Sequence, residues 1–421
     1  MTEPAVPPRR GLIHIDMHYL TEVIFEKKNE RFFESRHSDG YFDYVWGVHP
    51  FADIAGKKSR EIEIIRFSDR QQVIEGSSQA LGLPRFLMPL NFLLSQVKLL
   101  FLLVGIARRN KVAVISATDP HYLGLLGLAL KIICRRPLVV HVYANFDELY
   151  EATGALAMPR LLFFRWVERL VARIVLSNAD LAIAPNENNM RFCVNNGARR
   201  LRAVISNAKY VEDEHLRPPE EREAPEETMR RLGIPIGPPL MLCVGRLVAL
   251  KHSDDAVRAM AEVINRRPDA VGLMAGRGPM EPEIEALIDD LGMRGRILML
   301  GFVNQQDLSV ILPRTVTVSP LTGMALIESG LAGSPVVAYD RDWQKDFVRD
   351  GDGGFVVPFG DHKAMGARIL DILNDPALAA RFSAAIRARA RELADRDRIR
   401  DGERAAFDSV LDAWDRRKKK R

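Results

Sequence analysis

The second half of the chain alternates short apolar runs with segments of helical periodicity, and this alternation restricts the fold more than any other feature. After the first run, Val257, Met260 and Ile264 fall on one helical face, and Ser253 is a candidate N-cap. Alternation of this kind predicts a parallel, doubly wound α/β sheet. The predicted strands lie at 240–245, 271–276, 297–302, 316–320 and 335–340.

The first half repeats this pattern, with predicted strands at 11–16, 61–67, 112–116, 137–143 and 180–185 and helices at 87–107, 122–134 and 159–176. The Pro- and Glu-rich segment 217–239 has the composition of a linker. We therefore expect two Rossmann-like doubly wound domains facing across a cleft, at 1–216 and 240–394. A C-terminal helix and basic tail, 395–421, is expected to pack back towards the first domain.

Length and composition agree with this division. A chain of 421 residues exceeds one ordinary core, and 47% hydrophobic with 27% charged residues is typical of a globular protein. No signal peptide is recognisable, and the three scattered cysteines predict a reduced, cytoplasmic protein. Basic residues do not interleave with aromatic ones along a face, so we expect no nucleic-acid partner.

Two cations follow the strand at 240–245. Gly245 ends the run, Arg246 follows, and Lys251 precedes the next helix. Arginine binds phosphate oxygens in a fork, lysine adds a point charge, and a helix N-terminus also attracts anions. These residues predict a diphosphate site that can stabilise a departing nucleotide. The alternative is two surface cations on a loop.

Two further strands also end in glycine. Gly276 and Gly278 follow the strand at 271–276, but Glu281 occupies the place of the third glycine of a dinucleotide fingerprint. Gly301 lies near the end of the strand at 297–302. Glycines here allow close approach of the backbone to a ligand.

Beyond the strand at 316–320, Thr322-Gly323 precedes a helix that contains Glu328. A carboxylate there can accept hydrogen bonds from both hydroxyls of a ribose. The alternative is an exposed helical glutamate.

In this order, the pieces resemble the donor domain of GT-B glycosyltransferases, specifically the large retaining family 4, over about 240–375. The resemblance rests on Gly245-Arg246-Leu247 with Lys251, Gly276-Arg277-Gly278-Pro279, Leu300-Gly301-Phe302, and Glu328-Ser329 leading to Pro335-Val336-Val337.

The resemblance implies a metal-independent enzyme without a cofactor. It would move a sugar, with retention, from a UDP- or GDP-sugar to a glycan or lipid-linked glycan acceptor in bacterial surface polysaccharide or glycolipid synthesis. Arg246 and Lys251 would hold the diphosphate and Glu328 the ribose, while the glycine-ended strands would frame the base.

Two departures from the family pattern stand out. Pro320 lies eight residues before Glu328, where the family has an acid that contacts the transferred sugar, so we expect Thr322 and the backbone at Gly323 and Met324 to take over. The second concerns the family's histidine at the end of the "PLVV" strand, since Tyr143 falls there and His141 lies two residues earlier. His141 is the candidate base, or a hydrogen-bonded core residue. The triplet Asp340-Arg341-Asp342 is expected to be a loop, not a metal site.

Two other classes of function remain open. One is a sugar-nucleotide-binding protein without catalysis, and the other, which the missing third glycine opposes, is an epimerase or oxidoreductase. For location, we expect a cytoplasmic protein, peripheral at the inner face of the plasma membrane. The apolar stripe of 86–107, the cations Arg108, Arg109 and Lys111, and the tail at 416–421 would face anionic lipid. A core helix with a solvated tail is the alternative.

Overall fold

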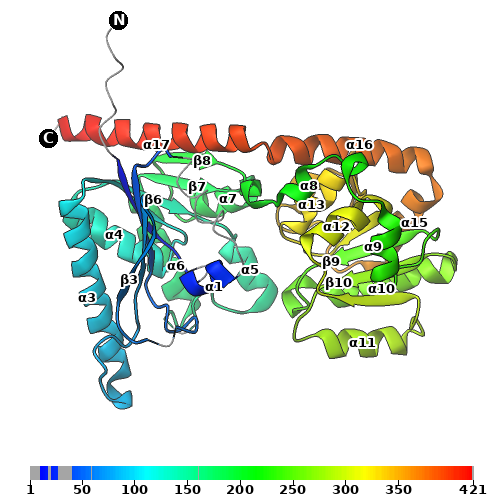
Figure 1. Ribbon diagram of the computed structural model, residues 1–421, viewed down its shortest axis with the longest axis horizontal. Helices are drawn as coiled ribbons and strands as arrows, with labels where there is room; N and C mark the ends of the chain where they lie inside the picture. The colour runs from blue at the N-terminus through cyan, green and yellow to red at the C-terminus, as the bar shows by residue number, and fades with distance from the viewer. Residues whose placement is uncertain (1–9, 18–19, 27–39, 58, 160, 420–421) are drawn as a thin grey trace, which may run out of the picture. The chain divides into compact units, whose positions relative to one another are not determined.

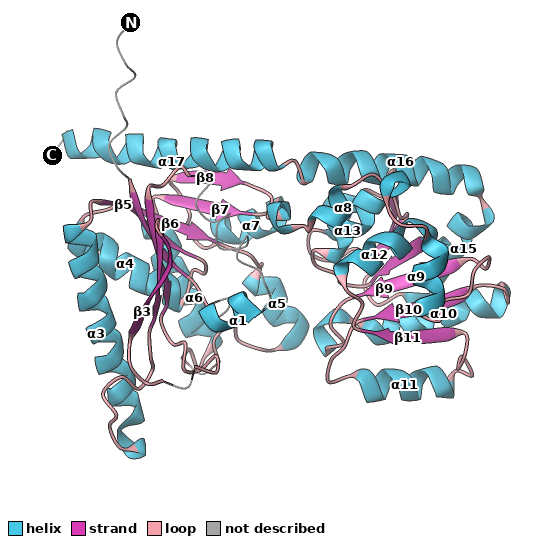
Figure 2. Cartoon of the chain, viewed as in Figure 1, coloured by secondary structure: helices cyan, strands magenta, loops and turns pink. Residues whose placement is uncertain are grey.

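The computed structural model describes residues 10–17, 20–26, 40–57, 59–159 and 161–419. The chain divides into two compact units, of which unit 1 contains the residues up to Ser206 and those from Asp397, and unit 2 spans Asn207–Arg396. Each unit is built around its own mainly or wholly parallel sheet with helices (Figures 1 and 2), which confirms the predicted doubly wound α/β fold.

The sheet of unit 1 has the order β3-β4-β2-β1-β5-β6-β7-β8. All neighbours pair in parallel except β3 and β4, which are antiparallel. The strand order reverses between β1 and β5. Its strands are β1 (Gly11–Ile15), β2 (Tyr44–His49), β3 (Glu63–Ser68), β4 (Gln71–Glu75), β5 (Val112–Ala117), β6 (Leu138–His141), β7 (Leu181–Ala184) and β8 (Leu201–Val204).

Helices cover both faces of this sheet. Side chains of α3, α4, α6 and α7 share one hydrophobic cluster with Ile13, Ile15 and Ile115 of the sheet. Ala406, Phe407 and Val410 of α17 pack on the other face, against Leu12 and Val114. The helices are α1 (Thr21–Glu26), α3 (Met88–Arg109), α4 (Tyr122–Cys134), α5 (Phe146–Thr153), α6 (Arg165–Asn178), α7 (Glu187–Asn195) and α17 (Arg396–Lys419).

The sheet of unit 2 is entirely parallel, in the order β11-β10-β9-β12-β13-β14. The order in which the strands are added reverses between β9 and β12. Its strands are β9 (Leu240–Val244), β10 (Val271–Ala275), β11 (Ile297–Gly301), β12 (Thr315–Ser319), β13 (Val336–Tyr339) and β14 (Gly354–Val357). Its helices are α8 (Asp213–Leu216), α9 (Pro225–Arg231), α10 (Ser253–Arg266), α11 (Glu281–Asp290), α12 (Gln305–Ile311), α13 (Ala325–Ala332), α14 (Gln344–Val348), α15 (His362–Asn374) and α16 (Pro376–Leu393).

The segment 217–239 differs from the linker that its composition predicts, and the first domain ends earlier than 216. Met229 and Ile234 are buried in a hydrophobic cluster of unit 2, and Arg231 forms an ion pair with Asp307 at 2.7 Å. The division between the units falls at Ser206 instead. Scattered apolar residues among prolines and glutamates gave too weak a periodicity for this packing to be recognised.

Candidate functional site

Ligands of open α/β sheets bind beyond the carboxyl ends of the strands, where the strand order reverses. In unit 2 this point lies between β9 and β12, whose loops carry most of the predicted site residues. Arg246 and Lys251 follow β9, while Thr322, Gly323 and Met324 follow β12. The fold therefore brings both groups to one edge of one sheet.

Arg246 and Lys251 place two positive charges at this edge. Arg246 is exposed and Lys251 half-buried, and neither forms an ion pair with an acidic side chain within the part of the chain that is described. Burial, followed by the nearby Arg246 charge, lowers the pKa of Lys251, and Asp342 opposes this shift. Two cations close enough to repel each other are stabilised by an anion between them.

The helix α10 begins directly after Lys251. His252 occupies the N-cap position with a left-handed backbone (φ 49°), and no side chain caps the helix. Ser253, the predicted cap, is instead the first helical residue. The first amides of α10 thus lack a side-chain acceptor and add positive potential beside the two cations.

Gly276 and Gly278 are required by backbone packing. A Cβ atom on Gly276 would lie 1.8 Å from the carbonyl oxygen of Gly245, and one on Gly278 would lie 2.2 Å from that of Leu247. The loops after β9 and β10 therefore touch each other. Gly301 (φ 65°) lies against the guanidinium of Arg277, which pairs with Glu281 at 2.8 Å.

Thr322 is held inside its loop. Its hydroxyl contacts that of Ser319, and its N–H donates to Gln344 Oε1 at 3.2 Å. Gln344 also donates to the carbonyl oxygen of Pro320 at 3.0 Å, so this buried amide, which the sequence did not indicate, fixes the loop after β12. The sequence gives no sign of its burial, since Gln344 begins the polar first turn of α14.

The amides that follow Thr322 are available. Among the described residues, the N–H groups of Gly323, Met324 and Ala325 donate to no other backbone group, and no side chain caps α13. A Cβ atom on Gly323 would meet no atom within 4 Å. Three consecutive amides beside open space form a place where an anionic or hydroxyl oxygen can be bound.

Glu328 is a buried carboxylate in the first turn of α13, with 6% of its surface exposed. Burial, aided by the charge of Glu212, raises the pKa of Glu328 from 4.5 to about 7. A buried carboxylate is costly unless it is paired or accepts hydrogen bonds. This cost is relieved when the hydroxyls of a ligand donate to it.

In unit 1, His141 ends β6 and is buried. Its ring lies 6.0 Å from that of Tyr143 in a stacked orientation and 6.0 Å from that of His14. His14 in turn places Nδ1 3.3 Å from Ser116 Oγ and Nε2 3.6 Å from Asp16 Oδ2. The sequence did not indicate this group; it arises because β1, β5 and β6 are adjacent.

Two more buried groups at this edge were missed. Burial raises the pKa of Asp119 to about 7 and lowers that of His121 to about 4. Asp119 Oδ1 accepts from the N–H of His121 at 2.6 Å, which fixes the turn between β5 and α4.

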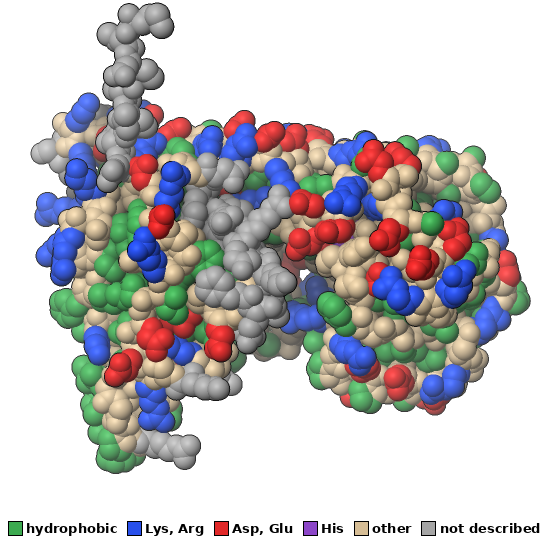
Figure 3. Space-filling view, viewed as in Figure 1, with side chains coloured by type: hydrophobic (Ala, Val, Ile, Leu, Met, Phe, Trp, Pro, Cys, Tyr) green, Lys and Arg blue, Asp and Glu red, His purple; other side chains and the backbone are tan. Residues whose placement is uncertain are grey.

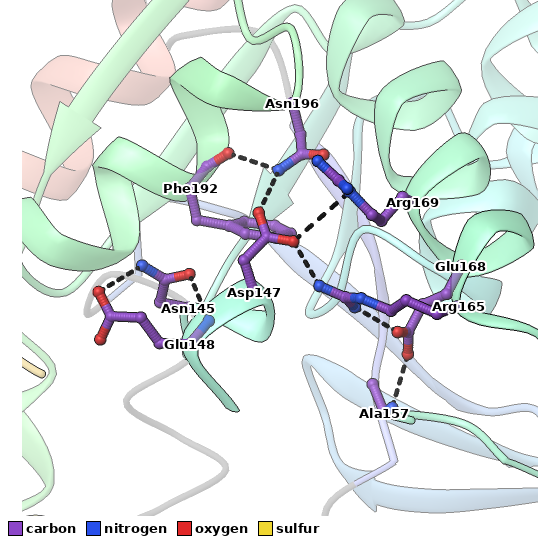
Figure 4. A network of polar contacts seen from close by, with 9 residues as sticks. All are labelled: Asn145, Asp147, Glu148, Ala157, Arg165, Glu168, Arg169, Phe192 and Asn196. Carbon is purple, nitrogen blue, oxygen red and sulfur yellow. Dashed lines mark hydrogen bonds and ion pairs between the residues drawn. The ribbon is translucent and has the colours of Figure 1, made fainter. Parts of the chain in front are cut away.

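The helix after Tyr143 is anchored by a polar network (Figure 4). Asn145 caps α5, and Asp147 contacts Arg165, Arg169 and Asn196 from α6 and α7. Arg165 also contacts Glu168, whose Oε1 accepts from the N–H of Ala157 at 2.6 Å. The network fixes the chain that leaves the edge containing His141.

Asp340, Arg341 and Asp342 lie in a loop after β13, as expected. Asp340 pairs with Lys345 at 2.8 Å, and Arg341 lies over the ring of Phe359. Within the described part of the chain, no three His, Cys, Asp or Glu side chains are grouped as ligands for a metal ion.

Comparisons with known proteins identify a family match in the second half of the chain. Residues 225–389 match the model of the family described as Glycosyl transferases group 1. The alpha-D-kanosaminyltransferase of Streptomyces kanamyceticus is 27% identical over 255 residues, which are 59% of this chain and 64% of that protein. The D-inositol 3-phosphate glycosyltransferase of Acidothermus cellulolyticus is 36% identical over 36% of this chain and 37% of its own. The chain thus covers less than two thirds of these curated relatives.

Solved structures resemble the whole chain. Sucrose-phosphate synthase from Thermosynechococcus elongatus has a TM-score of 0.72 at 18% identity, covering 96% of this chain and all of that one. The Anabaena protein HepE in complex with UDP has a TM-score of 0.69 at 18% identity, covering 95% and 100%. The similarity at this level of identity establishes the fold, which is GT-B.

Proposed function

Because the chain belongs, through residues 225–389, to the glycosyl transferases group 1 family, we propose that it transfers a sugar from a nucleoside-diphosphate sugar to a glycan or lipid-linked glycan acceptor. The observation that supports this most directly is the pairing of Arg246 and Lys251 at the switch point of unit 2. Neither side chain forms an ion pair among the described residues, although Asp342 is near enough to Lys251 to oppose the lowering of its pKa. A diphosphate matches the two positive charges.

Each group of the site has a role in this proposal. Arg246, Lys251 and the first amides of α10 bind the diphosphate, and Glu328 accepts hydrogen bonds from the ribose. When the bond between the anomeric carbon and the diphosphate breaks, negative charge grows on the leaving oxygen, next to the two cations. Preorganised charge at that position lowers the barrier.

The sugar is proposed to be bound by backbone groups. The hydroxyl and N–H of Thr322 already form hydrogen bonds within the loop. The amides of Gly323, Met324 and Ala325 therefore take the place of the acid that the family has and this chain lacks. A site that recognises its sugar through amides accepts oxygen atoms of any hydroxyl or phosphate, which relaxes its selectivity for one sugar.

The acceptor is assigned to unit 1. There, His141 is proposed to receive the proton of the acceptor hydroxyl as the new bond to the anomeric carbon forms with retention. The buried neighbours His14 and Asp16 would set its orientation. Of the solved relatives, HepE is described in complexes with UDP and UDP-glucose, and one curated relative is GDP-mannose-dependent, so UDP- and GDP-sugars are the donors to test.

A second candidate is a protein that binds sugar nucleotides without transferring the sugar. The hydroxyl of Thr322 favours it, because this group contacts Ser319 within its loop instead of facing a sugar. Incubation with a panel of UDP- and GDP-sugars separates the two. Release of nucleoside diphosphate that depends on Lys251 supports the transferase. Donor binding with no release, alone or with glycan acceptors, supports the second candidate.

A further inference from the structure

The helices α3, α4 and α6 of unit 1 form a layer whose outward side is unusually apolar. All three bury their inner sides in one cluster on the sheet, and α4 contacts both neighbours. We call the opposite, exposed side the helix-layer face. Its apolar side chains include Leu93, Val97 and Phe101 of α3 and Trp166, Leu170 and Ile174 of α6.

The polarity of the first half of α3 is inverted. Its buried residues there are Asn91, Ser95 and Gln96, whereas Leu93 is 58% exposed. A surface helix of a water-soluble domain has the opposite arrangement. From Leu99 onwards the buried residues are apolar, although Phe101 is 71% exposed. In Figure 3, apolar side chains gather over the lower part of unit 1, where α3 begins, and Lys and Arg side chains lie above them.

By length and composition α3 could cross a membrane, but its polar side attaches it to the segments that follow β2 and β4. Ser95 Oγ accepts from the N–H of Ala80 at 2.8 Å, and Gln96 Nε2 donates to the carbonyl oxygen of Pro50 at 3.2 Å. Crossing a bilayer would break these bonds and expose the core beneath. The helix is therefore suited to lie on a surface.

The start of α6 repeats the inversion. Arg165 points inward to Asp147 and Glu168 (Figure 4), while its neighbours Phe164 and Trp166 are 60% and 67% exposed. The polar network therefore holds two stacked aromatic rings outward.

Charge on this face has one sign. Between Gly76 and Phe146 the only acidic residue is Asp119, which is buried, and the only acid of α6 is the buried Glu168. The same segment, Gly76 to Phe146, contains eight basic residues: Arg85, Lys98, Arg108, Arg109, Lys111, Lys131, Arg135 and Arg136. Of these, Lys131 is engaged in an ion pair with the buried Asp180 at 2.6 Å.

We propose that the helix-layer face docks on the surface of an anionic lipid bilayer. Its apolar side chains would enter the boundary between headgroups and acyl chains, and its cations would contact lipid phosphates. A second copy of the chain would place two basic faces against each other, which opposes self-association. The proposal does not depend on the transferase activity.

The basic C-terminal tail is not the main anchor in this proposal. The helix α17 packs on the other face of the sheet, and Arg417 forms an ion pair with the buried Asp180 at 2.8 Å. Part of the tail's charge is thus engaged within unit 1.

Co-sedimentation of the full chain with phosphatidylcholine vesicles, with and without phosphatidylglycerol, tests the proposal. We expect binding only to the anionic vesicles, weakening with salt. Leu93→Glu/Phe101→Glu should reduce it at least tenfold. Arg108→Gln/Arg109→Gln should reduce it about 25-fold, since each cation contributes about fivefold, or 1 kcal/mol. Deleting Lys418–Arg421 should weaken binding less than either pair.

Matched controls are Ile236→Glu, which replaces an exposed apolar residue of unit 2, and Arg230→Gln/Arg314→Gln, which removes two exposed cations there. Both should bind like the wild type. The proposal is wrong if the wild type does not sediment with anionic vesicles at low salt, or if the face variants and the controls lose binding equally. It is also wrong if the chain forms a dimer that Leu93→Glu/Phe101→Glu dissociates.

Discussion

At the scale of single residues, Arg246 and Lys251 place two positive charges at the carboxyl end of β9, and neither forms an ion pair within the described part of the chain. Arg246→Ala or Lys251→Ala should each lower turnover about 100-fold, as expected for the loss of one preorganised charge contact at a leaving group. Initial rates of nucleoside diphosphate release measure this. Thermal unfolding should be nearly unchanged, and near-normal rates in both variants would remove the diphosphate role.

Glu328 should lower the stability of the free protein, because its carboxylate is buried without the ribose hydroxyls that are proposed to donate to it. Its pKa is about 7 in the folded protein and ordinary, near 4.5, when unfolded. The folded state therefore retains a proton that the unfolded state loses, and stability falls as the pH rises between these values. Glu328→Gln should raise the free energy of unfolding by up to about 3 kcal/mol above about pH 7. The gain should vanish below about pH 4.5, where the carboxyl is protonated in both states.

Denaturant unfolding of both proteins across this range checks the sign. The same variant should bind UDP or GDP more weakly, because a neutral amide replaces the ribose acceptor. An equal effect on stability at all pH values would mean that Glu328 is not a buried ionisable group.

At the scale of elements, the loops after β9 and β10 are packed backbone against backbone. Gly278→Ala would place a methyl group 2.2 Å from the carbonyl oxygen of Leu247, and should cost about 3 kcal/mol of stability. Gly323→Ala is the matched control, since its methyl group meets open space, and should change stability by less than about 0.5 kcal/mol. Equal losses in the two variants would contradict this packing.

Much of unit 2 could be predicted because most of its strands are short runs rich in apolar residues. The strands that were not predicted are β2, β4, β8 and β14. They contain polar or small residues, such as Gln71 and Gly354, which interrupt the apolar pattern. The antiparallel β3 was expected as part of a parallel sheet, because one sequence shows a strand but not the direction of its partner. Gln344, which fixes the loop of Thr322, and Glu212, whose charge raises the pKa of Glu328, come from distant segments with no local signal.

At the scale of the whole molecule, two doubly wound α/β domains could be predicted from the alternation of strands and helices, and the GT-B fold from the resemblance over about 240–375. The group of His14, Asp16 and His141 could not, because it depends on which strands are neighbours. The roles of the site residues remain predictions.

Metal independence is a property of the whole reaction. If Arg246, Lys251 and the N-terminus of α10 carry the leaving charge, EDTA should leave the release of nucleoside diphosphate unchanged, and added magnesium or manganese should not raise it. Loss of activity in EDTA with recovery on adding either ion would require a different account of the leaving group.

Calorimetric titration of UDP and GDP into the full chain tests most directly whether unit 2 binds a nucleoside diphosphate. One nucleotide should bind at a single site with a Kd in the range of about 1–100 μM, and Arg246→Ala/Lys251→Ala should weaken it at least about 100-fold, or 2.7 kcal/mol, while remaining folded. Absence of binding for both nucleotides, or unchanged affinity in the double variant, would contradict the proposed site.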